Sequence, residues 1–253
     1  MLRCRKEMLS EAMVMEPGAG DPYSYTPAGA KTYSTFGIEG TTYEIGYDCV
    51  SELLHGSIRG NVFLDFGCGS GRSTAFLKEL GAGYVYGVDH DQDMIDLAVA
   101  TNLDGAEFLL IADIIPLPDE SVDGAVSLTV FIEIRTIDAM RRACSEVARV
   151  LRRGSLFIVM SINPTAFGHT FRNFGYLATG QLHSGAITTA ILTAPGGQIS
   201  IDDTYWTEDD YTSALSSAGF TVASIDYPRP GDPSAWATDE AAVPPFIVIK
   251  AIK

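Results

Sequence analysis

The stretch Val62-Phe63-Leu64-Asp65-Phe66-Gly67-Cys68-Gly69-Ser70-Gly71-Arg72-Ser73-Thr74 decides the fold of this chain. Its apolar beginning is typical of a buried parallel strand. Three glycines at alternate positions follow, and they let the backbone turn sharply and approach a ligand that a Cβ would block. Ser73 and Thr74 then open a helix. Because a helix N-terminus carries unpaired N–H groups, we expect this turn to hold an anionic part of a ligand.

The glycine spacing separates two kinds of nucleotide ligand. The dinucleotide fingerprint G-x-G-x-x-G has its third glycine where this chain has Arg72, and Gly71 comes one residue early. Asp65, at the end of the strand, would repel a pyrophosphate, whereas its carboxylate suits a ligand ammonium. The pattern therefore favours a nucleoside that carries an amino acid. A nicotinamide-dependent oxidoreductase is the less favoured alternative.

Two further acids end predicted strands. Asp89 closes the predicted strand 84–89 and lies about 20 residues beyond the glycines, the spacing at which an acid meets ribose hydroxyls. Asp91 is well placed to cap the next helix, so Asp89 is not needed for that purpose. Asp113 lies in the predicted strand region 108–114, where a carboxylate can accept a hydrogen bond from an adenine amino group.

Four segments, in this order, resemble the class I S-adenosylmethionine (SAM) dependent methyltransferases. They are LDFGCGSG at 64–71, GVDHD at 87–91, LIADIIPLPDESVDGAVS at 110–127 and EVARVLRRGSLFIVM at 146–160. The likeness is loosely to the small-molecule type, such as the toxoflavin-type and quinone-pathway enzymes. It implies SAM as cofactor, with S-adenosylhomocysteine as product. It also implies a three-layer α/β, Rossmann-like fold, whose seven-stranded sheet has the order 3-2-1-4-5-7-6 and an antiparallel last strand.

The same resemblance assigns side chains to each part of the cofactor. The methionine moiety would be lined by Asp65, Gly67, Cys68, Gly69 and Ser70; the ribose by Asp89; the adenine by His90, Met94, Asp113 and Ile114; and the remaining surface by Leu128 and Tyr33. No metal is predicted, because Asp202 and Asp203 have no partner ligand pattern and the four cysteines form no C-x-x-C pair.

Three side chains are candidate general bases or acids. Glu133 follows the predicted fourth strand, 122–130, on the edge of the sheet where ligands bind in open α/β folds. His169 and His183 titrate near neutrality and lie in the stretch 163–206. A surface or capping role is the alternative for each of the three.

The stretch 163–206 is expected to set the choice of substrate. It is rich in aromatic residues, and 187–193 and 198–205 read as two strands of a hairpin. Together with the N-terminal segment it would form a lid that excludes water from the reaction. These aromatics favour a small aromatic or heteroaromatic metabolite, with N, O or C as the methyl acceptor. The likeness to the small-molecule enzymes implies a role in natural-product biosynthesis. The alternative is that these aromatic residues form the small hydrophobic core of the lid itself.

Composition excludes several partners. The net charge of −15 argues against nucleic acid, whose phosphates need clustered Lys and Arg, and against an anionic membrane surface. No apolar run is long enough to span a membrane, and no secretory signal is seen, so a cytoplasmic location is expected. We expect a flexible or partly disordered segment at 1–32 and a single domain at 33–253, as a monomer or homodimer. A non-catalytic SAM-binding protein is the remaining alternative to an enzyme.

Overall fold

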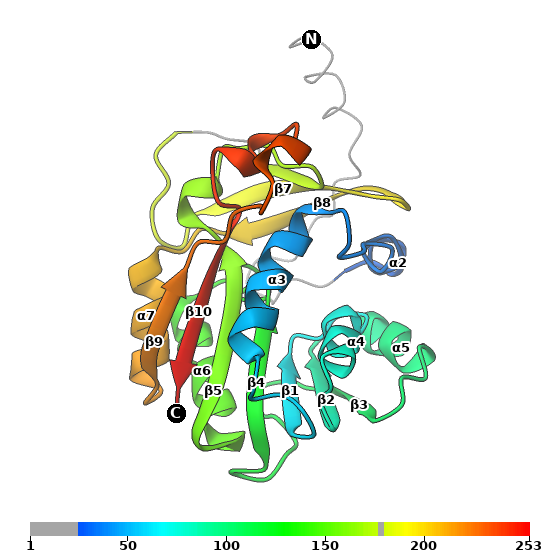
Figure 1. The fold of residues 1–253 in the computed structure, drawn as a ribbon, viewed down its shortest axis with the longest axis vertical. Coiled ribbons are helices and arrows are strands. Elements are labelled where there is room, and N and C mark those ends of the chain that lie inside the picture. The colour runs from blue at the N-terminus through cyan, green and yellow to red at the C-terminus, as the bar shows by residue number, and fades with distance from the viewer. Residues whose placement is uncertain (1–24, 177–179) are drawn as a thin grey trace.

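A seven-stranded sheet forms the centre of the computed structural model, which describes residues 25–176 and 180–253. The strand order is β3-β2-β1-β4-β5-β10-β9 (Figure 1). The strands are β1 Val62–Phe66, β2 Tyr84–Asp89, β3 Ala106–Leu110, β4 Val122–Leu128, β5 Leu151–Ile162, β9 Thr221–Asp226 and β10 Phe246–Ile252. β10 runs antiparallel to both of its neighbours, while the other neighbouring pairs are parallel. The predicted sheet order and its antiparallel last strand are confirmed.

Helices cover both faces of this sheet and complete the three layers. One face carries α3 Thr42–Leu54, α4 Arg72–Glu79 and α5 Gln92–Ala100, and the other carries α6 Ile137–Val150 and α7 Glu208–Ser217. Successive side chains of a strand point to opposite faces. In β1, Phe63 therefore packs into the core under α3 and α4, and Leu64 packs into the core under α6 and α7.

Local sequence signals set the helix ends. Asp91 caps α5, since its Oδ1 accepts a hydrogen bond from the Met94 N–H at 3.1 Å. Thr207 and Asp210 form a capping box at the start of α7. α4 begins directly after Gly71, whose φ of 92° lies in the left-handed region that favours glycine. The glycine turn therefore leads straight into a helix N-terminus, as the sequence indicates.

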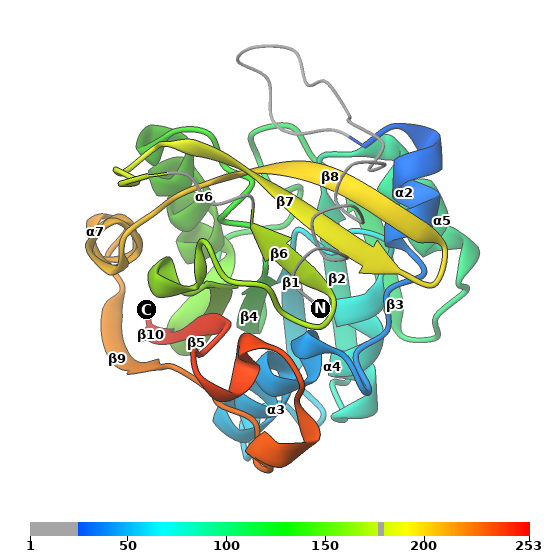
Figure 2. The same ribbon diagram turned by 90° about the horizontal axis from the view of Figure 1, so that it is seen from above.

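A second, three-stranded antiparallel sheet lies across the carboxyl ends of the parallel strands (Figures 1 and 2). It consists of β6 Phe174–Tyr176, β7 Ile187–Ala194 and β8 Gly197–Thr204, which we call the lid sheet. The predicted hairpin is therefore present as β7 and β8. The lid sheet joins the main domain through apolar packing and through the Thr204 N–H, which donates to the Ile132 carbonyl at 2.6 Å.

The N-terminal part of the described chain lies beside the lid sheet. The short helix α2 Pro27–Tyr33 packs against β8 and α5. Most of the predicted flexible segment 1–32, namely residues 1–24, lies outside the described residues. Within the described ranges, no helix combines the length and the apolar character needed to cross a membrane.

Candidate active site

The glycine turn between β1 and α4 is built around Asp65. This carboxylate is fully buried, and its Oδ2 accepts hydrogen bonds from Ser73 Oγ at 2.7 Å and Thr74 Oγ1 at 2.6 Å. Its Oδ1 is also buried but has no hydrogen-bond partner. Burial raises the pKa of Asp65 to about 6, against the two hydroxyl hydrogen bonds, which lower it. The turn therefore presents one unfilled acceptor, which suits the amino group of a ligand.

Asp89 joins the end of β2 to the glycine turn. Its Oδ2 accepts from the Gly69 N–H at 2.8 Å, and its Oδ1 accepts from the Asp91 N–H at 3.0 Å. Asp91 in turn accepts from the Tyr25 N–H at 2.8 Å through its second oxygen. This chain of contacts holds Tyr25 of the N-terminal segment beside the turn, so a ligand bound there would be covered by that segment.

A small cavity of about 40 Å³, which we call the loop cavity, lies against the glycine turn. It is lined by Tyr25, Tyr33, Gly67, Gly69, Asp89, His90, Asp91, Met94, Leu128, Thr129, Val130 and Glu133. Seven of these are predicted cofactor residues, from five separate segments of the chain: Tyr33, Gly67, Gly69, Asp89, His90, Met94 and Leu128. The structure therefore brings together most of the predicted set at one point.

The remaining predicted cofactor residues lie around this cavity. Cys68 is buried, and burial raises the pKa of its thiol well above the usual value, so the thiol stays neutral. Ser70 lies in the turn, partly buried, without lining the cavity. Ile114 is 69% exposed and follows β3, which ends at Leu110, earlier than predicted.

Asp113 lines a second and larger cavity of about 290 Å³, the adenine-side cavity. It adjoins the loop cavity, because both are lined by His90, Val130 and Glu133. Arg135 also lines the adenine-side cavity, and both of its terminal nitrogens are buried without a hydrogen-bond partner. Asp113 therefore lines the same cavity as His90, the other acidic or basic residue predicted to border the adenine.

A third cavity, of about 20 Å³, lies under the lid sheet, and we call it the lid cavity. Its wall is mostly aromatic and aliphatic, with two carboxylates: Tyr33, Tyr43, Thr129, Ile132, Glu133, Ile162, Phe174, Tyr176, Ala190, Leu192, Ile201 and Asp203. It shares Tyr33, Thr129 and Glu133 with the loop cavity. Glu133 is thus the residue that lines all three cavities.

The environment of Glu133 makes it a weak acid. Its Oε1 accepts a hydrogen bond from the Tyr25 hydroxyl at 3.1 Å. Burial raises the pKa of Glu133 to about 8, and the negative charges of Asp203 and Asp89 act in the same direction. A carboxylate with this pKa takes up and releases a proton near neutrality, as a general base must. The predicted catalytic position of Glu133 thus coincides with a suitable environment.

The two predicted histidines lie away from these cavities. His169 has a 40% exposed side chain, and its Nδ1 lies 3.2 Å from Asp239 Oδ2. His183 is exposed in the connection that precedes β7. Neither lines the loop, adenine-side or lid cavity. The structure therefore brings only Glu133, of the three candidate bases, to the predicted cofactor residues.

Two site residues carry no recognisable sequence signal. Thr129, just after β4, has a φ of 62°, which is strained for a β-branched residue, and it lines both the loop and the lid cavity. Arg72 stacks its guanidinium on Tyr43 and Tyr33, at 4.8 and 5.3 Å from the ring centroids. Arg72 Nε is buried without a partner. The residue that breaks the dinucleotide fingerprint thus places a cation beside the glycine turn.

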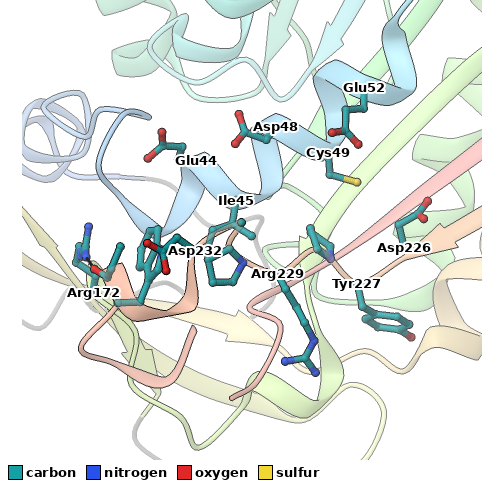
Figure 3. A pocket seen from close by; sticks show the side chains of 15 residues that line it. Glu44, Ile45, Asp48, Cys49, Glu52, Arg172, Asp226, Tyr227, Arg229 and Asp232 are labelled. Carbon is teal, nitrogen blue, oxygen red and sulfur yellow. Dashed lines mark hydrogen bonds between the residues drawn. The ribbon is translucent and has the colours of Figure 1, made fainter. Parts of the chain in front are cut away.

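A hollow larger than these three cavities lies elsewhere on the described surface. This groove, of about 610 Å³, lies between α3 and the segment 226–236 (Figure 3). Glu44, Asp48 and Glu52 from α3 line one side of it, and Arg229 and Asp232 lie on the other. It shares no lining residue with the three cavities at the glycine turn. Among the described residues, no group of three His, Cys, Asp or Glu side chains is arranged to hold a metal ion.

Comparison with known proteins finds methyltransferases. Residues 64–159 match the family model described as "Methyltransferase domain". The N-demethylindolmycin N-methyltransferase of Streptomyces griseus is 28% identical over 180 residues, which cover 68% of this chain and 75% of that protein. The O-methyltransferase rstn1 of Aspergillus nomiae is 30% identical over 112 residues, 42% of this chain and 48% of that protein.

Solved structures share the fold. A SAM-dependent methyltransferase from Mesorhizobium loti is 22% identical, with a TM-score of 0.62 over 86% of this chain and 100% of that one. The CcbJ methyltransferase of Streptomyces caelestis is 17% identical, with a TM-score of 0.63 over 88% and 95% of the two chains. The family match sets aside the nicotinamide alternative. The methyltransferase domain match at 64–159, the methyltransferase relatives and the shared fold together support a SAM-dependent methyltransferase.

Proposed function

We propose that this enzyme transfers the methyl group of SAM to an N, O or C atom of a small aromatic or heteroaromatic metabolite in natural-product biosynthesis. The observation that carries the proposal is the aromatic wall of the lid cavity, which adjoins the loop cavity through Tyr33, Thr129 and Glu133. Two relatives are named as methyltransferases, one for N- and one for O-methylation, and the former acts on N-demethylindolmycin. These names support a small substrate and leave the acceptor atom open.

Residues of the glycine turn, the loop cavity and the adenine-side cavity fit the parts of the cofactor. The unfilled Asp65 Oδ1 would take the amino group of the methionine moiety, and Arg72 would face its carboxylate. Asp89 would bind the ribose, and His90 and Asp113 would border the adenine. When bound, SAM supplies a methyl carbon that is activated by the sulfonium beside it. The chain must then align the acceptor and exclude water, and alignment alone contributes about 7–11 kcal/mol.

Glu133 is the residue we assign as general base. It lines both the loop cavity and the lid cavity, so it lies between the proposed positions of cofactor and acceptor. With a pKa of about 8, its carboxylate readily takes a proton from the acceptor. Protonation also removes a negative charge from a buried site. The predicted bases His169 and His183 lie outside these cavities, so Glu133 is preferred to both.

Substrate entry requires movement in this proposal. The lid cavity of about 20 Å³ holds no more than one water molecule, which is far less than an aromatic ring needs. The lid sheet, or the segment of Tyr25 and α2 that covers the loop cavity, must therefore move outward when substrate binds. Its return would expel water from the reacting groups.

The net charge of the chain supports a small molecule, rather than nucleic acid, as the methyl acceptor. A net charge of −15 disfavours nucleic acid as substrate, since phosphates would be repelled. We therefore propose a free small molecule, rather than RNA or DNA, as the acceptor. A cytoplasmic enzyme that is a monomer or homodimer is the form in which we expect this activity.

Calorimetric titration followed by methyl transfer tests the proposal. The full chain is titrated with SAM, S-adenosylhomocysteine and NADH, and is then assayed with tritium-labelled SAM on phenols, indoles, N-heterocycles and a tRNA mixture. We expect micromolar binding of the first two, none of NADH, and label transfer only to small aromatic compounds. Asp89→Ala, which removes the acid at the loop cavity, is expected to lose binding of both. Transfer to tRNA, or to no aromatic compound, would refute the substrate assignment.

A further inference from the structure

Asp203 is a buried carboxylate with half of its hydrogen-bonding capacity unfilled. It lies on the lid strand β8 and is 1% exposed. Its Oδ2 accepts a hydrogen bond from the Tyr176 hydroxyl at 2.6 Å, but its buried Oδ1 has no partner. Leaving a buried acceptor unpaired costs about 1–3 kcal/mol, and more when the group is charged. The unpaired Asp203 Oδ1 therefore indicates that a hydrogen-bond donor of a bound ligand pairs with it.

The neighbouring acid on β8, Asp202, shows that a carboxylate on this strand can be paired within the chain. Asp202 points to the other face of β8, because successive strand side chains alternate. Its Oδ1 accepts from Thr189 Oγ1 at 3.1 Å, so it is paired across the hairpin. A purely structural role for Asp203, as a support for Tyr176, explains its Oδ2 contact but leaves its Oδ1 unexplained.

The unfilled carboxylate lines the cavity in which the acceptor is proposed to bind. Asp203 comes from the lid sheet, and Glu133 comes from the chain that follows β4, so the two acids approach the lid cavity from different layers. The rings of Tyr43, Phe174 and Tyr176 form much of the remaining wall. A planar apolar group with one polar, hydrogen-donating atom matches this lining.

The charges around the cavity select the kind of donor. Glu133 and Asp203 supply two carboxylates, and Arg135 is the cation whose charge acts on both. Arg135 lines the adenine-side cavity instead, and within the described residues it forms no ion pair with either acid. Arg72 stacks on Tyr33 and Tyr43 without lining the lid cavity. Above a pH of about 8, where both acids are ionised, the acceptor therefore meets an excess of negative charge.

This excess separates oxygen from nitrogen acceptors. A phenol must lose its proton to become a good nucleophile, and with that proton on Glu133 the phenolate would stand beside the ionised Asp203, which repels it. A nitrogen instead gains positive charge as its bond to the methyl carbon forms, and the two acids stabilise that charge as it develops. The surrounding aromatic rings favour a cation as well.

We propose that Asp203 and Glu133 hold an N–H-bearing, basic nitrogen of the aromatic substrate, and that this nitrogen is the methyl acceptor. The proposal rests on the function proposed above. The nitrogen lone pair forms the bond to the methyl carbon, the carbon–sulfur bond breaks with its electron pair on sulfur, and the N–H proton passes to Glu133. Asp203 recognises the nitrogen through its unfilled Oδ1.

Matched pairs of small molecules test this recognition in the full chain. The probes are tryptamine against tryptophol and 2-phenylethylamine against 2-phenylethanol, which differ in an amine or a hydroxyl on the same frame. Binding is measured by calorimetry with saturating S-adenosylhomocysteine, and label transfer from tritiated SAM is measured in parallel. We expect each amine to bind about 10- to 100-fold more tightly than its alcohol, the range that one charge-assisted hydrogen bond supplies.

Variants then locate the preference. Asp203→Asn is expected to reduce the amine preference at least about tenfold without altering the affinity for S-adenosylhomocysteine. Asp202→Asn, the same change on the other face of β8, is expected to keep the preference. Tyr176→Phe removes the hydroxyl that donates to Asp203 while keeping the ring, and it is expected to reduce the amine preference. It replaces Asp203→Asn as the test if that variant is poorly folded.

The outcomes distinguish this inference from the function beneath it. Equal binding of amines and alcohols by the wild-type chain, or an unchanged preference in both Asp203→Asn and Tyr176→Phe, overturns the inference and leaves the proposed function standing. Binding of S-adenosylhomocysteine with no binding of any aromatic probe overturns the proposed function, and the inference falls with it.

Discussion

Neutralising Asp203 should change the pH dependence of stability in a direction that the structure fixes. The pKa of this carboxyl is raised by burial to about 7 in the folded chain, from an ordinary value of 3.8. The Tyr176 hydrogen bond and the charge of Arg135 lower it only in part. Between these two values the folded state keeps a proton that the unfolded state has released. The free energy of unfolding must therefore fall as the pH rises through this window.

The size of the effect follows from the two pKa values. Each unit of difference is worth about 1.36 kcal/mol, so Asp203 alone lowers the free energy of unfolding by about 2.5 kcal/mol between pH 5 and pH 8. Glu133 and Asp65 have raised pKa values and add slopes of the same sign. Asp203→Asn removes one of these contributions. It also weakens another, because the charge of Asp203 helps to raise the pKa of Glu133.

Urea unfolding at pH 5, 6, 7 and 8 measures this difference. The wild-type chain and Asp202→Asn should both lose stability steeply across the range, whereas Asp203→Asn should lose about 2–3 kcal/mol less. Parallel slopes for Asp203→Asn and the wild type would show that the carboxyl is already ionised at pH 5 when folded. Such a result would refute the argument that burial keeps it neutral.

Further predictions concern the glycine turn and the general base. Gly67→Ala forces a left-handed φ of 77° on alanine and brings a Cβ to 2.3 Å from Val130 Cγ2, so urea unfolding should show a loss of at least about 2 kcal/mol in the free energy of unfolding. Gly69→Ala, whose Cβ meets no atom within 4 Å, should remain folded with a smaller loss, yet calorimetry should show weakened S-adenosylhomocysteine binding because the methyl group enters the loop cavity. Glu133→Gln should lower kcat by about 10²–10⁴-fold in the label-transfer assay with little change in S-adenosylhomocysteine affinity. The wild-type rate should rise with pH through about 8, as Glu133 loses its proton, and this limb should be absent in Glu133→Gln.

Local sequence patterns predicted the position of the glycine turn, and the resemblance to the class I methyltransferases implied the order of the main sheet. The strand at Val62–Phe66 and the glycines after it are encoded in consecutive residues, and so is the cap of α5 at Asp91. Asp89 could be placed at the turn because the carboxyl ends of neighbouring parallel strands meet at one edge of the sheet. The hairpin of the lid sheet was predicted from its own residues, because its turn and its two strands are consecutive in the sequence.

The prediction was weaker wherever a role depends on which face a side chain presents. The spacing at His169 and His183 allowed a catalytic role, but the fold turns both away from the three cavities. Asp203 drew attention only as half of an acidic pair. Whether it or Asp202 faces the cavity depends on the register of β8 against β7.

The sequence by itself indicated the methyltransferase fold and its SAM cofactor, because the motifs that carry the resemblance are short-range runs of glycines, acids and apolar residues. Only the tertiary structure decided which groups surround the acceptor. It set Glu133 beside three cavities, buried Asp203 with one oxygen unfilled and held Thr129 at a strained φ of 62°. These features arise from contacts between segments tens of residues apart, where packing fixes burial, charge and orientation together.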